Sequence, residues 1–107
     1  MLQKTIFVVL ALALSIIPAQ ADIKKGSKAY LKQCKKCHGN GTKGASMKSQ
    51  AEWNEAFADN AKVFKQWHAG TKGEKYVSSK KFSKFAPHLK DFLHEYGNDS
   101  GNVPSCG

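Results

Sequence analysis

The chain has 107 residues, of which 17 are Lys or Arg and 8 are Asp or Glu, so that its formal net charge is +9. This length permits a single domain. Every basic residue is a lysine, which argues against a nucleic-acid partner because the arginine fork that reads bases and phosphates in bidentate fashion is missing.

The first 21 residues have the pattern of a secretory signal peptide. Lys4 supplies a basic start, Thr5 to Ile17 is almost wholly apolar, and the small residues of Pro18-Ala19-Gln20-Ala21 precede Asp22. The apolar run is shorter than the roughly 20 residues of a membrane-spanning helix. We therefore expect residues 1–21 to be removed on export to the periplasm, leaving no stable membrane anchor and a single domain from 22 to 107.

The remaining 86 residues carry a net charge of +8 once Lys4 is removed. A domain of this size buries only about 60% of its unfolded surface, so its core needs a further source of stability. The lysines suit the long-range steering of a transient acidic partner, although a solvated surface that maintains solubility is an equally good interpretation.

The first predicted helix runs from about Ile23 to Lys36. Gly26, Tyr30 and Cys34 recur every four residues and therefore share one helical face. The segment Gly39 to Gly44 that follows is rich in residues that tolerate positive φ, and it is expected to be a loop.

The second predicted helix begins with a capping box, Ser49-Gln50-Ala51-Glu52, and ends before Gly70. At 100° per residue its aromatic residues form one stripe, with His68 at the edge of that stripe; they are Trp53, Phe57, Phe64 and Trp67. Such a stripe is usually an ordinary core.

The third predicted helix runs from about Ala86 to Tyr96, with Pro87 in its first turn. One face is apolar and contains Leu89, Phe92 and Tyr96. Because no stretch alternates as a strand does, the predicted fold class is all-α.

The segment Cys34-Lys35-Lys36-Cys37-His38 matches C-x-x-C-H, the pattern of c-type haem attachment. Its two cysteines lie about one helical turn apart and can form thioethers with the two haem vinyl groups, and the histidine that follows can bind the iron. A dithiol redox motif would need a βαβ pattern, a zinc site would need a fourth ligand at regular spacing, and a disulfide would close a very short loop.

The chain resembles the small monohaem c-type cytochromes of bacteria, through Gly26, Tyr30, Cys34-x-x-Cys37-His38-Gly39 and the pair Leu93 and Tyr96. The resemblance implies a class I-like bundle of three to five helices around one covalent haem c, with terminal helices that cross at Gly26. It also implies electron transfer as the activity.

The resemblance leaves the second axial ligand of the iron open, because the segment Lys75 to Lys84, where the family usually supplies a Met, contains none. His68 is our prediction, since it follows His38 by 30 residues and ends the aromatic stripe. The alternatives are His88, Met47, a lysine among Lys80 to Lys84, or no ligand. His94 lies opposite the apolar face of its helix and is expected to be solvated.

The sequence thus predicts a periplasmic electron carrier with transient acidic redox partners, steered by lysines such as Lys25, Lys28, Lys35, Lys36 and Lys43. No acid–base or nucleophilic constellation is present, so an enzyme is not expected. The alternatives are a haem-based sensor with a displaceable sixth ligand, or an accessory subunit of a larger oxidoreductase. Cys106 has no internal partner and could pair between two chains.

Overall fold

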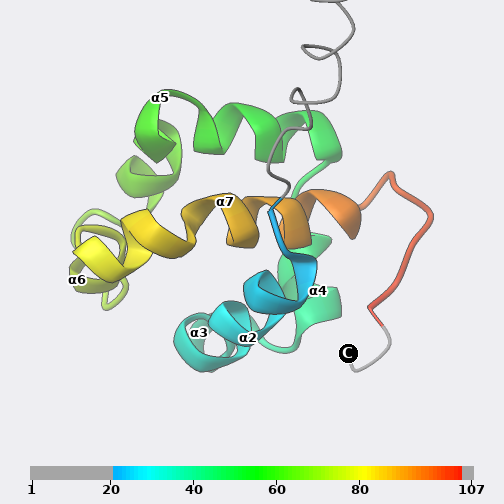
Figure 1. Cartoon of the computed structure of the whole chain (residues 1–107), viewed down its shortest axis with the longest axis horizontal. Coiled ribbons are helices and arrows are strands. Elements are labelled where there is room, and N and C mark those ends of the chain that lie inside the picture. Colours follow the sequence, from blue (N-terminus) through cyan, green and yellow to red (C-terminus); the bar gives the residue numbers. More distant parts are fainter. Residues whose placement is uncertain (1–20, 105–107) are drawn as a thin grey trace, which may run out of the picture.

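The computed structural model describes residues 21–104, and within this range it contains six helices and no strand. The three long helices are α2 (Ile23–Gln33), α5 (Gln50–His68) and α7 (Lys80–Glu95), and the short ones are α3 (Lys35–His38), α4 (Gly41–Ala45) and α6 (Glu74–Val77). Figure 1 shows α7 in the middle, with α5 along one side of it and α2 crossing the other. The all-α prediction is confirmed, while the predicted signal peptide and Cys106 lie outside the described residues.

Helix α2 crosses α7 at Gly26, as expected. Its start is capped by the Asp22 carboxylate, which accepts hydrogen bonds from the backbone N–H groups of Lys24 at 2.9 Å and Lys25 at 3.3 Å. A Cβ atom at Gly26 would overlap the backbone carbonyl oxygen of His88 and would lie 2.9 Å from Cβ of Phe92. The two backbones can therefore approach this closely only because residue 26 lacks a side chain.

The predicted first helix is too long at its C-terminal end. Helix α2 stops at Gln33, and Cys34, at φ −114° and ψ −29°, links it to the separate turn α3. The segment predicted as a loop after the motif also contains a short helix, α4, whose N-cap Asn40 accepts a hydrogen bond from the Lys43 N–H group at 2.9 Å. The early end of α2 and the short helix α4 each involve about one helical turn, and the spacing of apolar residues does not predict features of that length.

Helix α5 begins with the predicted capping box, since Ser49 and Glu52 exchange hydrogen bonds of 2.8 and 3.2 Å. It is not straight, however. Ala58 is extended, and Asp59, Asn60 and Ala61 have φ of 54°, 57° and 56°. Asp and Asn tolerate this left-handed conformation well, whereas it costs Ala61 roughly 1–2 kcal/mol. The chain therefore changes direction in the middle of α5.

Because α5 changes direction, the prediction of a single aromatic stripe along it is wrong. Trp53 and Trp67 would lie about 21 Å apart along a straight helix, yet their ring centroids are only 6.3 Å apart. Phe57 and Phe64 are likewise brought to 4.5 Å. The aromatic residues form a cluster between two helical segments that face each other.

Helix α7 begins six residues earlier than predicted. The Ser79 hydroxyl caps it by accepting a hydrogen bond from the Phe82 N–H group at 3.1 Å. Pro87 is consequently in the interior of the helix and not in its first turn. A proline there removes a backbone hydrogen bond at a cost of about 3 kcal/mol, which tertiary packing must offset. Lys80 to Lys84 lie on α7, and the segment Lys75 to Lys84, which lacks the usual Met, is helical over most of its length.

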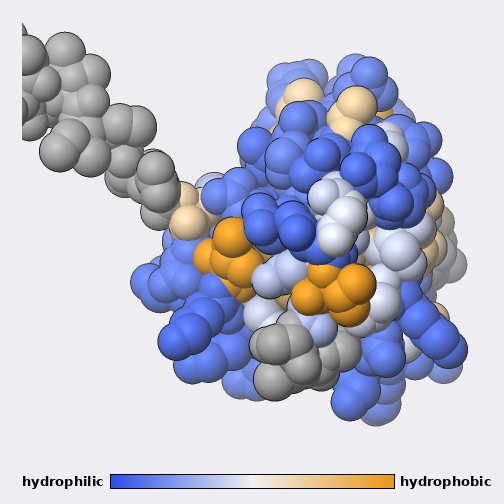
Figure 2. All heavy atoms as spheres, turned by 90° about the vertical axis from the view of Figure 1, so that its right-hand side faces the viewer, coloured by the Kyte–Doolittle hydropathy of each residue, from blue (hydrophilic) through white to orange (hydrophobic). Residues whose placement is uncertain are grey.

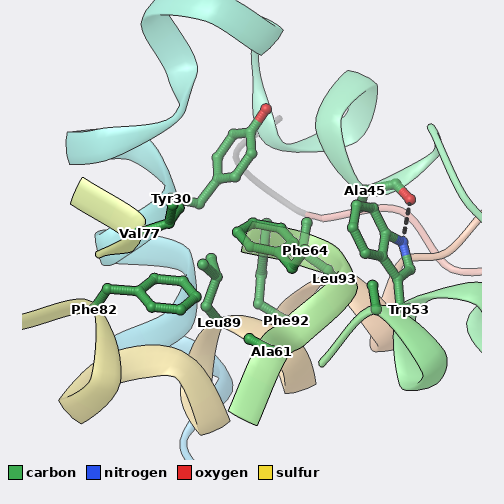
Figure 3. Packing of buried hydrophobic residues seen from close by; sticks show 11 residues of the cluster. Tyr30, Ala45, Trp53, Ala61, Phe64, Val77, Phe82, Leu89, Phe92 and Leu93 are labelled. Atoms are coloured by element: carbon green, nitrogen blue, oxygen red, sulfur yellow. Dashed lines mark hydrogen bonds between the residues drawn. The ribbon is translucent and has the colours of Figure 1, made fainter. Parts of the chain in front are cut away.

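The core is formed by apolar side chains of α2, α5, α6 and α7, which converge in Figure 3. Phe82, Leu89 and Phe92 are its largest fully buried members. Phe64 stacks on Phe82 at 5.5 Å, which ties the second half of α5 to α7. None of the described helices has both the length and the apolar character needed to cross a membrane.

Candidate functional site: a cavity around the Cys34–His38 motif

The motif residues are presented by the turn between α2 and α4. The N–H groups of Cys37 and His38 both bond to the Cys34 carbonyl oxygen, at 3.1 and 3.0 Å. Gly39, at φ +82°, then ends α3 in a conformation that favours glycine. The two thiols are not joined in a disulfide, so both are free to react.

A mostly apolar cavity of about 470 Å³ lies beside this turn. All four predicted site residues line it: Cys34, Cys37, His38 and His68. Most of its remaining wall is apolar and includes aromatic and aliphatic side chains of four helices, among them Tyr30, Trp53, Phe64, Tyr76 and Leu93. The volume is in the range of about 300–1,000 Å³ that is usual for cofactor sites.

His38 and His68 face each other across the cavity with ring centroids 6.1 Å apart and ring planes at 80°. Two imidazoles that bind one first-row metal ion from opposite sides, each through a nitrogen at about 2 Å, have centroids on the order of 6 Å apart. The observed separation therefore suits a single iron between the two rings.

The His68 ring is oriented by the backbone of its own helix. Its Nδ1 lies 2.7 Å from the Phe64 carbonyl oxygen, and because a carbonyl can only accept, Nδ1 must carry the proton. In the neutral ring the lone pair is then on Nε2, the atom that a metal would bind. Phe64 also packs against the same ring, with the centroids 4.6 Å apart and the planes tilted by 38°.

Burial, and to a lesser degree the nearby His68, lower the pKa of His38. Both causes disfavour a positive charge on the ring, so His38 is held in the neutral form that ligates iron. Burial, followed by the nearby Cys37, raises the pKa of Cys34 to about 12, which keeps that thiol protonated.

The alternative candidates for the second iron ligand differ in whether they line the cavity. Met47 lines the cavity but is 52% exposed. His88 lies elsewhere, and its Nδ1 accepts a hydrogen bond from the Asp22 N–H group at 2.8 Å. Neither His94 nor any residue from Lys80 to Lys84 lines the cavity; the lysines that do are Lys48 and Lys72.

Two positioning residues were missed by the sequence reasoning. The Tyr30 hydroxyl lies 2.7 Å from the Gly39 carbonyl oxygen and 3.0 Å from that of Asn40, and it bonds the turn after the motif to α2. Trp53 Nε1–H donates to the Ala45 carbonyl oxygen at 2.8 Å, as Figure 3 shows. Only the spacing of Tyr30 from Cys34 hinted at such a role, since the partners are backbone oxygens that no sequence pattern displays.

These residues fit a covalently attached haem: two free thiols one turn apart, two facing imidazoles and an apolar, aromatic wall. No group of three or more His, Cys, Asp or Glu side chains within residues 21–104 is arranged to hold a bare metal ion. When bound, a haem supplies a one-electron Fe(III)/Fe(II) couple.

Comparison with known proteins shows the class of protein to which the chain belongs. The model of the family described as "Cytochrome C oxidase, cbb3-type, subunit III" matches residues 21–89. Because this match covers more than half of the chain, the chain belongs to that family and is a c-type cytochrome, a protein of haem-based electron transfer with covalently bound haem c. No curated protein and no solved structure gave a significant match.

Proposed function

We propose that the chain is an exported monohaem electron carrier. Cys34 and Cys37 would hold one haem c through thioethers, His38 would bind the iron on one side and His68 on the other. The observation that carries the proposal is that these four residues line one apolar cavity with the two imidazoles 6.1 Å apart.

The side chains around the cavity suit electron transfer without a chemical step on a substrate. The Phe64 carbonyl holds His68 in one tautomer, and packed apolar side chains form most of the cavity wall, so that little has to move when the iron changes oxidation state. A bis-histidine site is expected to have a lower reduction potential than a His/Met site. We accordingly propose that the protein is not an enzyme in its own right.

The distribution of charge supports acidic redox partners. Residues 23–51 contain eight lysines and no acidic residue, whereas residues 52–107 contain eight lysines and seven acidic residues. Nearly all of the net charge therefore lies on the segment that carries the motif, including the exposed Lys35 and Lys36. Figure 2 shows that the face on the right-hand side of Figure 1 is mainly hydrophilic, with two small separate hydrophobic groups. Such a surface favours transient, steered encounters.

The periplasm is the proposed location, because the leader pattern of residues 1–21 directs export and c-type haem attachment belongs to that compartment. Removal of the leader would leave a protein that reaches its partners by diffusion.

The absorption spectrum of the purified holoprotein tests the ligand set. A sharp low-spin reduced spectrum that is unchanged by CO is expected. His68→Ala should make the iron high-spin and reactive with CO, whereas the control His94→Ala should leave the spectrum unchanged. If CO binds the wild-type protein rapidly, the iron has an open or displaceable site and the sensor alternative replaces the carrier.

The family's description favours a second candidate, a subunit that stays docked on a larger oxidase. Native membranes or extracts separate the two. A carrier elutes at the size of the single chain, whereas a subunit co-migrates with an oxidase at every purification step.

A further inference from the structure

The loop that follows α5 contains two glycines in opposite situations. Gly70 has φ +76°, and a Cβ atom added to it would meet no heavy atom within 4 Å. Gly73 has φ −82° and ψ −10°, a conformation open to most residues. A Cβ atom added there, however, would lie 3.0 Å from Cδ2 of His68 and 3.7 Å from its Cγ. Glycine at 70 therefore suits the backbone, whereas the missing side chain at 73 makes room for the His68 ring.

The ring atom beside Gly73 is the neighbour of the atom proposed to bind iron. In an imidazole, Cδ2 is bonded directly to Nε2, and the hydrogen bond between Nδ1 and the Phe64 carbonyl oxygen leaves the lone pair on Nε2. The Phe64 ring also packs against the His68 ring, with the centroids 4.6 Å apart. The His68 ring is thus contacted at Nδ1, by a neighbouring aromatic ring and at Cδ2, so that its neighbours limit how far Nε2 can move.

A threonine hydroxyl connects Gly73 to the end of α5. Thr71 Oγ1 donates to the His68 carbonyl oxygen at 2.7 Å and accepts a hydrogen bond from the Gly73 N–H group at 3.1 Å. The Glu74 carboxylate accepts a further hydrogen bond from the Gly70 N–H group at 3.2 Å. Because one hydroxyl bonds both the residue that carries the ring and the residue that lies against it, hydrogen bonds within this loop set the distance between the two.

We propose that Thr71 and Gly73 are positioning residues for His68, and that the loop of residues 70–74 controls how firmly this ring holds the iron. The inference rests on the function proposed above, in which His68 is the second axial ligand. Thr71 and Gly73 act through the ring, by limiting the movements that would take Nε2 away from the iron. The loop thereby regulates both the reduction potential of the site and the access of external ligands to it.

The contact at Gly73 predicts the direction of each effect. A methyl group at residue 73 would displace the ring by a few tenths of an ångström, since ordinary contacts of a Cβ atom lie at 3.4–4 Å. A displaced imidazole donates less well to Fe(III), which destabilises the oxidised state and raises the reduction potential. The weaker bond to Fe(II) is also more easily replaced by CO. A change that crowds the ring should therefore raise the potential and the affinity for CO together.

The test compares alanine at the two glycines in the purified holoprotein. CO titration of the reduced protein gives the apparent affinity for CO, and a redox titration gives the midpoint potential. We expect Gly73→Ala to bind CO about tenfold more tightly than the wild type, the effect of overpacking by one methyl group. Its spectrum should be partly high-spin and its potential higher. Gly70→Ala should lower the urea midpoint, because alanine is strained at positive φ, and leave the spectrum, the potential and the CO affinity unchanged.

Thr71 provides a second pair of variants with a smaller expected effect. Thr71→Val keeps nearly the same shape without the hydroxyl, so the His68 carbonyl oxygen loses one of its donors and the Gly73 N–H group loses its acceptor. The CO affinity and the potential should rise as in Gly73→Ala, but by less. Thr71→Ser keeps the hydroxyl and should recover most of the difference from the wild type. If Gly73→Ala yields no holoprotein, this pair decides, and equal CO affinities for Thr71→Val and Thr71→Ser would then contradict the proposal.

A Gly73→Ala holoprotein with the spectrum, potential and CO affinity of the wild type would overturn the positioning role but leave the carrier function intact. Equal changes in Gly70→Ala and Gly73→Ala would also overturn it, because the backbone of the loop, and not the contact with the ring, would then be responsible. If His68→Ala keeps the wild-type spectrum, His68 is not a ligand. The ligand set proposed above then fails, and the positioning role fails with it.

Discussion

The two walls of the cavity are built in different ways. The wall formed by residues 30–44 carries Cys34, Cys37 and His38 within a single turn, so local hydrogen bonds suffice to present them. The opposite wall carries His68, which reaches the cavity only because α5 reverses at residues 58–61. The comparison teaches that local structure is enough to present Cys34, Cys37 and His38 together, whereas bringing His68 to the same cavity depends on tertiary structure.

The largest effect is expected from changing the wall that carries Cys34 and Cys37. The double variant Cys34→Ser/Cys37→Ser has no thiol to form a thioether, so covalent haem should be lost completely. Denaturing gel electrophoresis followed by a haem stain measures this directly. Retention of stained haem on that variant would mean that another residue, such as Cys106, attaches it.

Ala61→Val should disturb the wall that carries His68 without preventing covalent attachment of the haem. A β-branched side chain at φ +56° in a buried site costs about 2 kcal/mol or more. We expect a lower urea midpoint and a partly high-spin spectrum, with covalent haem still present on a denaturing gel.

Ala58→Val is the matched control, since residue 58 is exposed and extended, with ψ 155°, and accepts valine without strain. If both valine variants keep a low-spin spectrum, the reversal does not control the position of His68.

Tyr30→Phe is expected to lower the free energy of unfolding by about 1 kcal/mol, because the carbonyl oxygens of Gly39 and Asn40 lose their hydrogen-bond donor. Burial, and then the nearby Cys34, raise the pKa of Tyr30 from 10.0 to about 12. The protonated phenol therefore stabilises the fold fully below pH 10, and this contribution is lost as the pH rises towards 12.

Urea titrations of the wild type and Tyr30→Phe at neutral pH and above pH 10 test this. The difference between the two proteins should shrink at alkaline pH. If Cys34 forms the proposed thioether in the holoprotein, its part of the shift disappears there and burial alone remains. A constant difference across the pH range would show that the phenol does not titrate as proposed.

The smallest effect is expected at the start of α5. Hydrogen bonds from Ser49 lower the pKa of Glu52 below its ordinary value of 4.5. Since the folded-state pKa is the lower one, the charged carboxylate stabilises the helix above about pH 4.5, and the contribution is lost as the pH falls further. Glu52→Gln should lower the melting temperature slightly at neutral pH and not at all at strongly acidic pH, by circular dichroism.

The local parts of the fold were predictable because each depends on a few consecutive residues. The capping box at Ser49 and the closure at Gly39 appear as residue types at fixed spacing. The crossing of α2 and α7 at Gly26 is not local, and it was expected only from the family resemblance. The start of α7 was missed because Pro87 suggests a first turn, although Ser79 is an equally good N-cap. Ser79 and Pro87 each indicate a helix start, and the packing of α7 against the core decides which start is used.

The sequence by itself determined the all-α class, and it predicts the attachment motif Cys34–His38, because both follow from short-range chemistry. It pointed to His68 on the assumption of a straight helix, and that assumption was wrong. Only the tertiary structure decided that His68 faces His38, that Met47 and two lysines share the cavity and that His88 does not. The physical reason is that three left-handed residues in α5 are tolerated only when aromatic packing on both sides offsets their cost, which no local pattern records.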